Sequence, residues 1–195
     1  KTKREDYKSV MRHTAYHEGC HAIVAMAVNI VAGRDDDAVT KVTILPRGRA
    51  LGYTMVNSDD DVTNYTRDEI NDQLAYMMGG RAAEEVFFTS PSTGAANDIE
   101  KAAGLARDAV VRYGFSDSMG LGLWSGDDVS DATRNSIDKE ISRKLSIAHA
   151  RAVDVINDNK DAMERLVDML MDKETVGLDD LKVIEDMIRS HYHVD

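Results

Sequence analysis

The sequence predicts a mainly α-helical fold of the α+β class, with one small β-sheet and a C-terminal helical bundle. Apolar residues recur at three- and four-residue steps over most of the chain, which indicates helices. Only the region near residues 39–57 has β-branched, alternating sequence, with Pro and Gly between two runs. Three helices are expected in succession near residues 130–190. We therefore expect a single domain over residues 1–195, with one lobe over residues 1–125 and a C-terminal helical subdomain over residues 130–190.

The first long helix is expected over residues 14–32, where the apolar residues are nearly continuous. A helix that is apolar all round is typically buried, and Gly33 can end it. The charged residues 1–12 are expected to form a short helix or a tail. The two strands are expected over residues 39–45 and 51–57, as a hairpin or as adjacent strands.

A second helix is expected to begin after Thr66. This residue and Glu69 form a capping box, in which each side chain bonds the backbone of the other residue. Apolar residues continue at helical spacing as far as Val86. Within this helix lie Gly79 and Gly80, each of which weakens a helix by roughly 1 kcal/mol relative to alanine. We expect that they allow close packing against a neighbouring helix.

The remaining helices are expected over residues 96–113, 132–157, 160–173 and 179–190. Gly114 is expected to end the first of them. The glycine-rich residues 115–128 are expected to be irregular.

The composition excludes several classes of protein. A net charge of −11, without a basic stripe, argues against nucleic-acid binding. A single cysteine, Cys20, excludes an internal disulfide. The chain has no phosphate-binding loop of the G-x-x-x-x-G-K-[ST] type and no secretory signal, and its longest apolar run, residues 22–32, is too short to cross a bilayer. We therefore expect this piece to be soluble, although a membrane anchor could lie outside it. Because it begins at Lys1 and not at Met, we expect a fragment or a processed product.

The residues most typical of a catalytic site are His17-Glu18-Gly19-Cys20-His21, which have the form H-E-x-x-H. On a helix, His17 and His21 lie one turn apart on the same face. Two imidazoles placed in this way can bind one zinc ion, and Glu18 is then close enough to act on a water molecule at the zinc. Because many unrelated zinc hydrolases share this motif, it predicts a metal site and no particular enzyme.

A catalytic zinc site needs a third protein ligand. One candidate is Asp98, expected in the first turn of a helix, where the helix dipole favours a carboxylate even without a metal. The other is Glu84, which can be a ligand, a support for a ligand or a solvated charge. Spacing alone does not choose between them. Of the other histidines, His13, His191 and His193 are expected at the surface, and His149 is expected to be structural.

Beyond these residues, the chain resembles the peptidase domain of the FtsH family, which are membrane-anchored, ATP-dependent AAA zinc metalloproteases. The resemblance rests on H-E-x-x-H followed in order by VTILPRG, LGYT, GGRAAEEVFF and STGAANDIEKAAGLARDAVVRYGFSDSMG, and it extends from about residue 14 to about residue 185. One position departs, because the family usually has glycine where Cys20 stands. We expect Cys20 to be a small buried residue and not an additional zinc ligand.

The resemblance implies that His17, His21 and Asp98 bind one zinc ion per subunit. It implies that Glu84 lies beside the site and holds a ligand histidine in orientation. The implied activity is that of a metalloendopeptidase that hydrolyses peptide bonds of unfolded or threaded proteins, in protein quality control. Its catalytic residue would be Glu18, the general base toward a zinc-activated water.

The resemblance also implies how the domain is placed in the whole protein. Residues 1–125 would be the zinc-site lobe, and the strands near residues 39–57 would lie beside the cleft, where an extended peptide can pair with a sheet edge. The implied assembly is a homo-hexamer. An AAA ATPase module and a transmembrane anchor would lie in the full-length chain outside these residues, with the peptidase domain on the cytoplasmic side, or on the matrix or stromal side in an organelle.

Two other functions remain open. The domain can be a catalytically inactive, zinc-containing module for oligomerisation or assembly, in which the long C-terminal helices make contacts between copies. The presence of three candidate ligands together with Glu18 favours the enzyme. A different zinc hydrolase, such as an aminopeptidase, would need a site that recognises a substrate end, and the sequence indicates none.

Overall fold

The structure is a computed structural model that describes residues 3–34, 37–46, 48, 50–57, 64–122, 124 and 129–194. Parts of the predicted N-terminal tail, of the turn between the strands and of the glycine-rich segment (residues 1–2, 47, 49, 123 and 125–128) lie outside the described residues. The described elements are α1 (Lys3–Val31), β1 (Val39–Thr43), β2 (Tyr53–Val56), α2 (Arg67–Met77), α3 (Gly79–Phe87), α4 (Ala96–Val111), α5 (Asp131–Asp158), α6 (Lys160–Lys173), β3 (Thr175–Gly177) and α7 (Leu178–Tyr192). The predicted mainly α-helical fold with a small sheet is confirmed.

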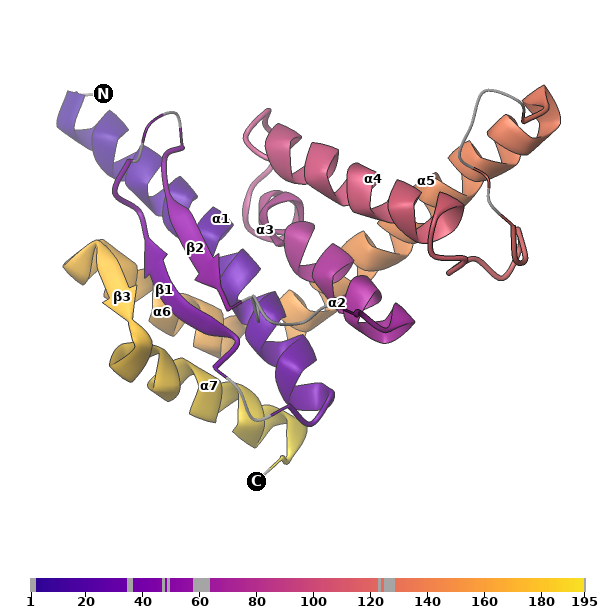
Figure 1. Ribbon diagram of the computed structural model, residues 1–195. Helices are drawn as coiled ribbons and strands as arrows, with labels where there is room; N and C mark the ends of the chain where they lie inside the picture. The colour runs from indigo at the N-terminus through magenta and orange to yellow at the C-terminus, as the bar shows by residue number, and fades with distance from the viewer. Residues whose placement is uncertain are drawn as a thin grey trace.

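Helix α1 lies at the centre of the domain, and Figure 1 shows the sheet beside it and other helices around it. Residues 19–30 are buried on every face of this helix, as the continuous apolar run predicts. The helix is continuous over 29 residues, so the described part of the predicted short helix or tail, residues 3–12, is instead the beginning of this helix. Charged residues extend a helix once its apolar half is held by packing. Gly33 follows its end with a φ of 68°, a conformation that glycine adopts without strain.

The sheet has three strands in the order β2-β1-β3. The predicted pairing of β1 with β2 is confirmed, and it is antiparallel, with Val42 opposite Thr54. The third strand, β3, pairs with the other edge of β1 and places Val176 opposite Val42. Sequence patterning does not detect β3 because three residues are too few to show an alternation. The strand β2 is therefore an edge of the sheet.

The predicted second helix is wrong in one respect, because it is divided at Met78 into α2 and α3. The capping box of Thr66 and Glu69 is present at the start of α2. Gly79 and Gly80 begin α3 where it meets α1, and a Cβ atom on Gly79 would lie 2.9 Å from the backbone nitrogen of His21. The expected close packing is thus confirmed, and the chain changes direction where it occurs.

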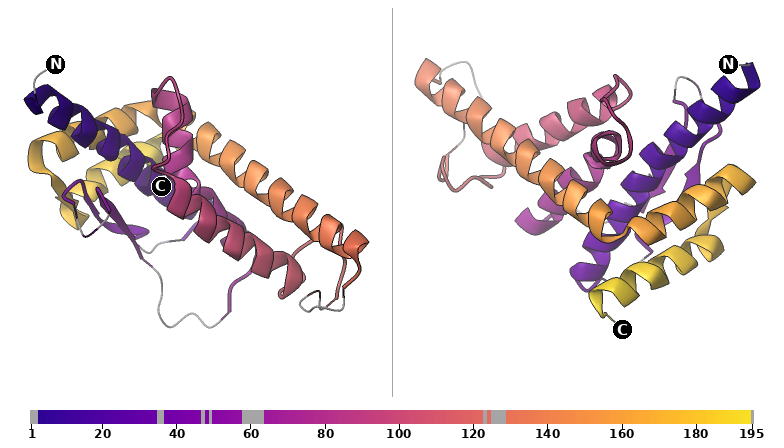
Figure 2. Two further views of the ribbon diagram at one scale, coloured as in Figure 1. Left: turned by 90° about the horizontal axis from the view of Figure 1, so that it is seen from above. Right: turned by 180° about the vertical axis from the view of Figure 1, so that it is seen from behind.

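The C-terminal helices pack against α1 and against the helices α2, α3 and α4 that follow the first two strands. Figure 2 shows α5 beside α4, and α6 and α7 beside α1. Their fully buried side chains complete the core: Ile156, Met163, Leu166, Leu170, Leu181, Ile184 and Ile188. The division into a lobe and a subdomain near residue 125 stays a prediction. Within the described part of the chain, no helix has both the length and the apolar character that a membrane span requires.

Glu140 on α5 is a buried carboxylate that we expect to stabilise the fold in a pH-dependent way. It accepts hydrogen bonds from Arg143 at 2.7 and 2.8 Å and from the Ser118 hydroxyl at 3.1 Å. The bonds from Arg143, followed by those from the neighbouring serines, outweigh burial and lower its pKa to about 2 from the ordinary 4.5. The stabilisation is therefore present above pH 4.5 and is lost as the pH falls toward 2.

Glu140→Gln should lower the free energy of unfolding at pH 7 by about 1–2 kcal/mol, a modest value because the Arg143 side chain is half-exposed. Urea denaturation at several pH values measures this, and the difference from wild type should shrink below pH 4.5. Glu100→Gln, at an exposed position on α4, is the matched control and should change little. A difference that is constant down to pH 3 would contradict the assignment.

Candidate metal centre

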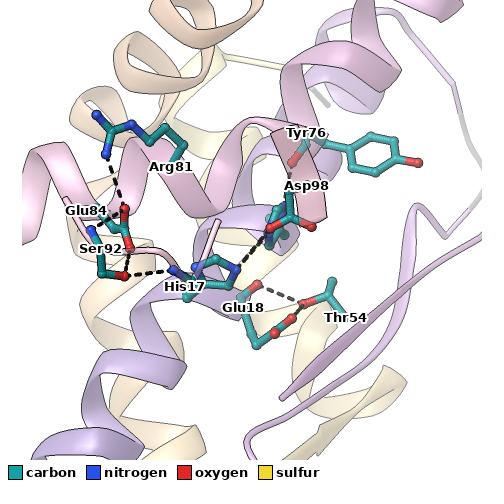
Figure 3. A network of polar contacts seen from close by, with 10 residues as sticks. His17, Glu18, Thr54, Tyr76, Arg81, Glu84, Ser92 and Asp98 are labelled. Atoms are coloured by element: carbon teal, nitrogen blue, oxygen red, sulfur yellow. Dashed lines mark hydrogen bonds and ion pairs between the residues drawn. The ribbon is translucent and has the colours of Figure 1, made fainter. Parts of the chain in front are cut away.

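Three side chains from two helices converge on one point, as Figure 3 shows in part. His17 and His21 come from the middle of α1, and Asp98 comes from the first turn of α4. The Oδ2 atom of Asp98 lies 3.2 Å from Nε2 of each histidine, and the two Nε2 atoms lie 3.4 Å apart. Among the described residues, this is the group of His, Cys, Asp or Glu side chains whose atoms are close enough to share a metal ion.

These separations fit a small divalent metal ion. Ligand atoms about 2.0–2.1 Å from a tetrahedral ion lie about 3.3 Å from one another. Two imidazole nitrogens and one carboxylate oxygen suit zinc among the biological metals, and three protein ligands leave a fourth position open. The structure thus brings the predicted ligands His17, His21 and Asp98 together in an arrangement that can hold a metal.

The ring of His21 is held in a defined orientation by a backbone group. Its Nδ1 atom lies 2.7 Å from the carbonyl oxygen of Tyr76, near the end of α2. With Nδ1–H donating to this carbonyl, the lone pair of Nε2 faces the cluster, which is how a metal-binding histidine is usually supported. The sequence contains no signal for this contact, because any residue at position 76 has the same carbonyl.

The cluster changes the pKa values of its own members. Burial lowers the pKa of His21, but the Asp98 carboxylate, Glu18 and the Tyr76 carbonyl outweigh it and leave the pKa above its ordinary value. Burial raises the pKa of Asp98, but the hydrogen bonds and charges of His17 and His21 outweigh it and hold the pKa well below its usual range. Asp98 is therefore a carboxylate at neutral pH, the form that binds a metal.

Glu18 lies beside the cluster and is held by the edge strand. The Thr54 hydroxyl of β2 lies 2.8 Å from Oε2 of Glu18 and 2.9 Å from the Glu18 carbonyl oxygen, and it can donate to either (Figure 3). Gly52, just before β2, also approaches closely, since a Cβ atom there would lie 2.7 Å from Cγ of Glu18. Sequence reasoning assigned no role to Gly52 or Thr54, although both belong to the LGYT segment that carries the resemblance.

Glu84 is completely buried on α3, and among the described residues it is not part of the cluster. It accepts hydrogen bonds from the Ser92 hydroxyl, from the Ser92 amide at 3.1 Å and from Arg81 at 3.3 Å. Burial raises its pKa, but these bonds and the nearby His17 outweigh burial and lower it. Figure 3 shows Ser92 between Glu84 and the His17 ring. The predicted role of Glu84 in orienting a ligand histidine stays a prediction.

The other candidates of the sequence lie apart from the cluster. His13 is not the surface residue that was expected, because it is half-buried with its ring 4.3 Å from that of Phe88. Cys20 is fully buried, with its sulfur 3.7 Å from that of Met163, and burial raises its pKa well above the ordinary value. It is a small buried residue, as expected. His149 lies 3.2 Å from Glu85, and the two C-terminal histidines, His191 and His193, are exposed as expected.

Gly80 of α3 lies against the cluster, and its lack of a side chain leaves room for the two histidine rings. A Cβ atom there would lie 2.6 Å from Nε2 of His17 and 2.7 Å from Nε2 of His21. Because both rings would have to move, Gly80→Ala should lower metal affinity by roughly 10–100-fold. Titration against a competing chelator measures this affinity.

Gly104→Ala on α4 is the matched control for this substitution, because a Cβ atom there meets nothing within 4 Å. It should leave metal affinity unchanged and can stabilise the helix by up to about 1 kcal/mol. Metal binding by Gly80→Ala equal to that of wild type would show that the rings are not held by this contact. Circular dichroism of both variants checks that the fold is retained.

The fold and the cluster define a mainly helical domain with two histidines, an aspartate and an adjacent glutamate in the arrangement typical of metallopeptidases. Residues 7–184 match Peptidase family M41, and the chain belongs to this family. The predicted resemblance to the FtsH peptidase domain is thereby confirmed.

Its relatives include proteins named ATP-dependent zinc metalloprotease FtsH. The protein of Cutibacterium acnes is 48% identical, with 84% of this chain and 24% of the relative covered. The protein of Cupriavidus metallidurans is 39% identical (88% and 27%), and that of Rubrobacter xylanophilus is 41% identical (87% and 27%). The chain therefore spans about a quarter of the length of these curated relatives.

Proposed function

We propose that this chain is the zinc-dependent endopeptidase domain of an ATP-dependent, membrane-bound protease, and that it hydrolyses peptide bonds of unfolded or threaded proteins. The observation that carries the proposal is the convergence of His17, His21 and Asp98 at distances that fit one metal ion, with Glu18 beside them. The names of the relatives, which are zinc metalloproteases, support zinc as that ion.

The chain's own residues supply the positioning and the proton transfer. A bound zinc ion supplies Lewis-acid chemistry, since it polarises a carbonyl group and lowers the pKa of water. Glu18 is the general base: it accepts a proton from the attacking water and then donates it to the leaving amine nitrogen. The Thr54 hydroxyl orients the Glu18 carboxylate for both transfers, and the Tyr76 carbonyl keeps His21 in place.

The substrate is proposed to bind as an extended strand along β2. This strand pairs with β1 on one side and is one of the two edges of the described sheet, and the backbone groups of an edge strand can bond an extended peptide. Because Thr54 of β2 contacts Glu18, a peptide on this edge would pass beside the cluster. Backbone pairing of this kind accepts many sequences, which suits a protease for unfolded chains.

We propose that the whole protein contains further parts besides this peptidase domain. The relatives are named ATP-dependent, and about three quarters of their length lies outside the similarity. We propose that this additional length holds an AAA ATPase module and a transmembrane anchor, and that six copies form a ring. The peptidase domain would lie on the cytoplasmic side, or on the matrix or stromal side in an organelle.

The proposed function is tested by zinc analysis and by cleavage of a short, unstructured, dye-labelled peptide, which needs no ATP-driven unfolding. We expect one zinc ion per chain, cleavage within the peptide, loss of cleavage with a chelator and recovery when zinc is added. A chain that contains no zinc and does not cleave contradicts the proposal. A chain with stoichiometric zinc but no cleavage supports the alternative of an assembly module.

A further inference from the structure

A cavity of about 290 Å³ lies between α2, α5 and the segment that follows α4. None of the cluster residues lines it. Four cationic side chains do, namely Arg67, Arg143, Lys144 and Arg151, whereas Asp117 is the one carboxylate on its described wall. This excess of positive charge contrasts with the net charge of −11 of the whole chain.

Lys144 is the member of this group for which the described residues supply no close ion pair. The residue is only 8% exposed. In the part of the chain that the structure describes, no carboxylate is recorded within ion-pair distance of its ammonium group, and no hydrogen bond from it is recorded. Burial, together with the charges of Arg143 and Arg67, lowers its pKa, and the charges of Glu140 and Asp117 offset this only in part. A buried charge is costly unless a counter-charge reaches it.

The other three cations of the cavity have partners within the chain. Arg67 lies 2.7 Å from Asp117, and Arg143 lies 2.7 Å from the buried Glu140. Arg151 lies 2.6 Å from Asp72, a carboxylate that also lies 2.6 Å from Arg34. These pairs hold the guanidinium groups in place around the cavity. The ammonium of Lys144 remains as the group that an anion from outside can pair with.

Apart from Asn71 and these charged residues, the side chains that line the cavity are apolar. Phe115 and Leu74 line it, and Phe115 is held from one side by the Arg67 guanidinium, 5.9 Å from the ring centre. Ile147 also lines it and is 53% exposed, so an apolar surface remains uncovered at the cavity. A bare phosphate or carboxylate group would not fill about 290 Å³ or cover these side chains.

We propose that this cavity binds an organic oxyanion, whose carboxylate or phosphate group pairs with Lys144 and whose apolar body packs against Phe115 and Ile147. The site is distinct from the metal cluster and does not depend on the proposed peptidase activity. Its neighbours Arg143 and Arg151 complete the positive surroundings of the anionic group. Carboxylate and phosphate groups both present negatively charged oxygens to Lys144, and binding of one probe of each kind distinguishes them.

The test measures binding of phenyl phosphate, benzoate and inorganic phosphate to the full chain by calorimetry, at an ionic strength held constant with sodium chloride. We expect saturable 1:1 binding of phenyl phosphate or benzoate, with inorganic phosphate at least tenfold weaker. The tighter of the two aromatic probes identifies the head group. Absence of saturable binding of both aromatic probes overturns the proposal, and equal binding of inorganic phosphate overturns the role of the apolar wall.

Lys144→Met keeps the apolar stem of the side chain and removes its charge, so affinity for the aromatic probe should fall at least tenfold. Lys139→Met, at an exposed position on the same helix, is the matched control and should bind as wild type does. Lys144→Gln serves as a second variant if the methionine disturbs the fold, which circular dichroism checks. Unchanged affinity in a folded Lys144 variant overturns the proposal.

Sedimentation velocity completes the test, because an acidic side chain of a second copy could occupy the same cavity. Self-association that Lys144→Met abolishes, in a chain that binds neither aromatic probe, would assign the cavity to a contact between copies and overturn the proposal.

Discussion

Replacing Glu18 by glutamine should lower peptide cleavage by about 10²–10⁴-fold while the metal stays bound. The amide of glutamine has nearly the same shape as the carboxylate but cannot accept a proton from water. Because Glu18 is not one of the three clustered ligand candidates, the metal should not be lost. The contact from Thr54, 2.8 Å from Oε2, can also be made to an amide oxygen, so the side chain should keep its place.

The measurement is kcat/KM for a short unstructured peptide, together with zinc content of the same sample. Glu100→Gln, at an exposed position on α4, is the matched control, since it makes the same chemical change at a carboxylate outside the group of clustered ligand candidates. It should cleave at the wild-type rate. Wild-type cleavage by Glu18→Gln would rule out the assigned general base and would direct attention to another carboxylate beside the cluster.

Asp98→Ala should lose zinc, and with it all cleavage. Asp98 is the one candidate ligand that comes from α4, and its carboxylate lies 3.2 Å from each histidine nitrogen. If a zinc-binding free energy of about 10–16 kcal/mol is shared among the three protein ligands, the loss of one lowers affinity by roughly 10²–10⁴-fold. The two remaining imidazoles carry no negative charge to compensate the ion.

Zinc content after dialysis against a weak chelator measures this loss. Asp108→Ala removes a carboxylate from the same helix, where Asp108 pairs with Arg112 near the surface, and should keep its zinc. Stoichiometric zinc in Asp98→Ala would exclude Asp98 as a ligand.

Much of the site was predictable because its first half is local. His17 and His21 are four residues apart on a helix, and helical geometry alone places them on one face. Asp98 has no such relation to them, and only the resemblance to a known family singled it out from Glu84. The contacts of Thr54 and of the Tyr76 carbonyl depend on how a strand and a helix end pack against α1, which no local pattern encodes.

The fold was predictable to a similar degree and for related reasons. Helical periodicity identified every long helix, but it continues through Met78 and therefore does not reveal the division between α2 and α3. That division results from the close contact of Gly79 and Gly80 with α1, a tertiary constraint. The strand β3 is formed by pairing with the second edge of β1. Its three residues are too few to show an alternating pattern in the sequence.

The ligand candidates on α1 and α4 have one further consequence. His21 and Asp98 are 77 residues apart in the sequence, and the sheet strands β1 and β2 and the helices α2 and α3 lie between them. An ion held by both would cross-link the chain and remove loop-closure entropy from the unfolded state, worth about 4 kcal/mol for a loop of this length. Loss of the ion would then lower the free energy of unfolding of the domain and also inactivate it. The fraction of folded protein and the fraction of active protein would therefore change together with the metal content.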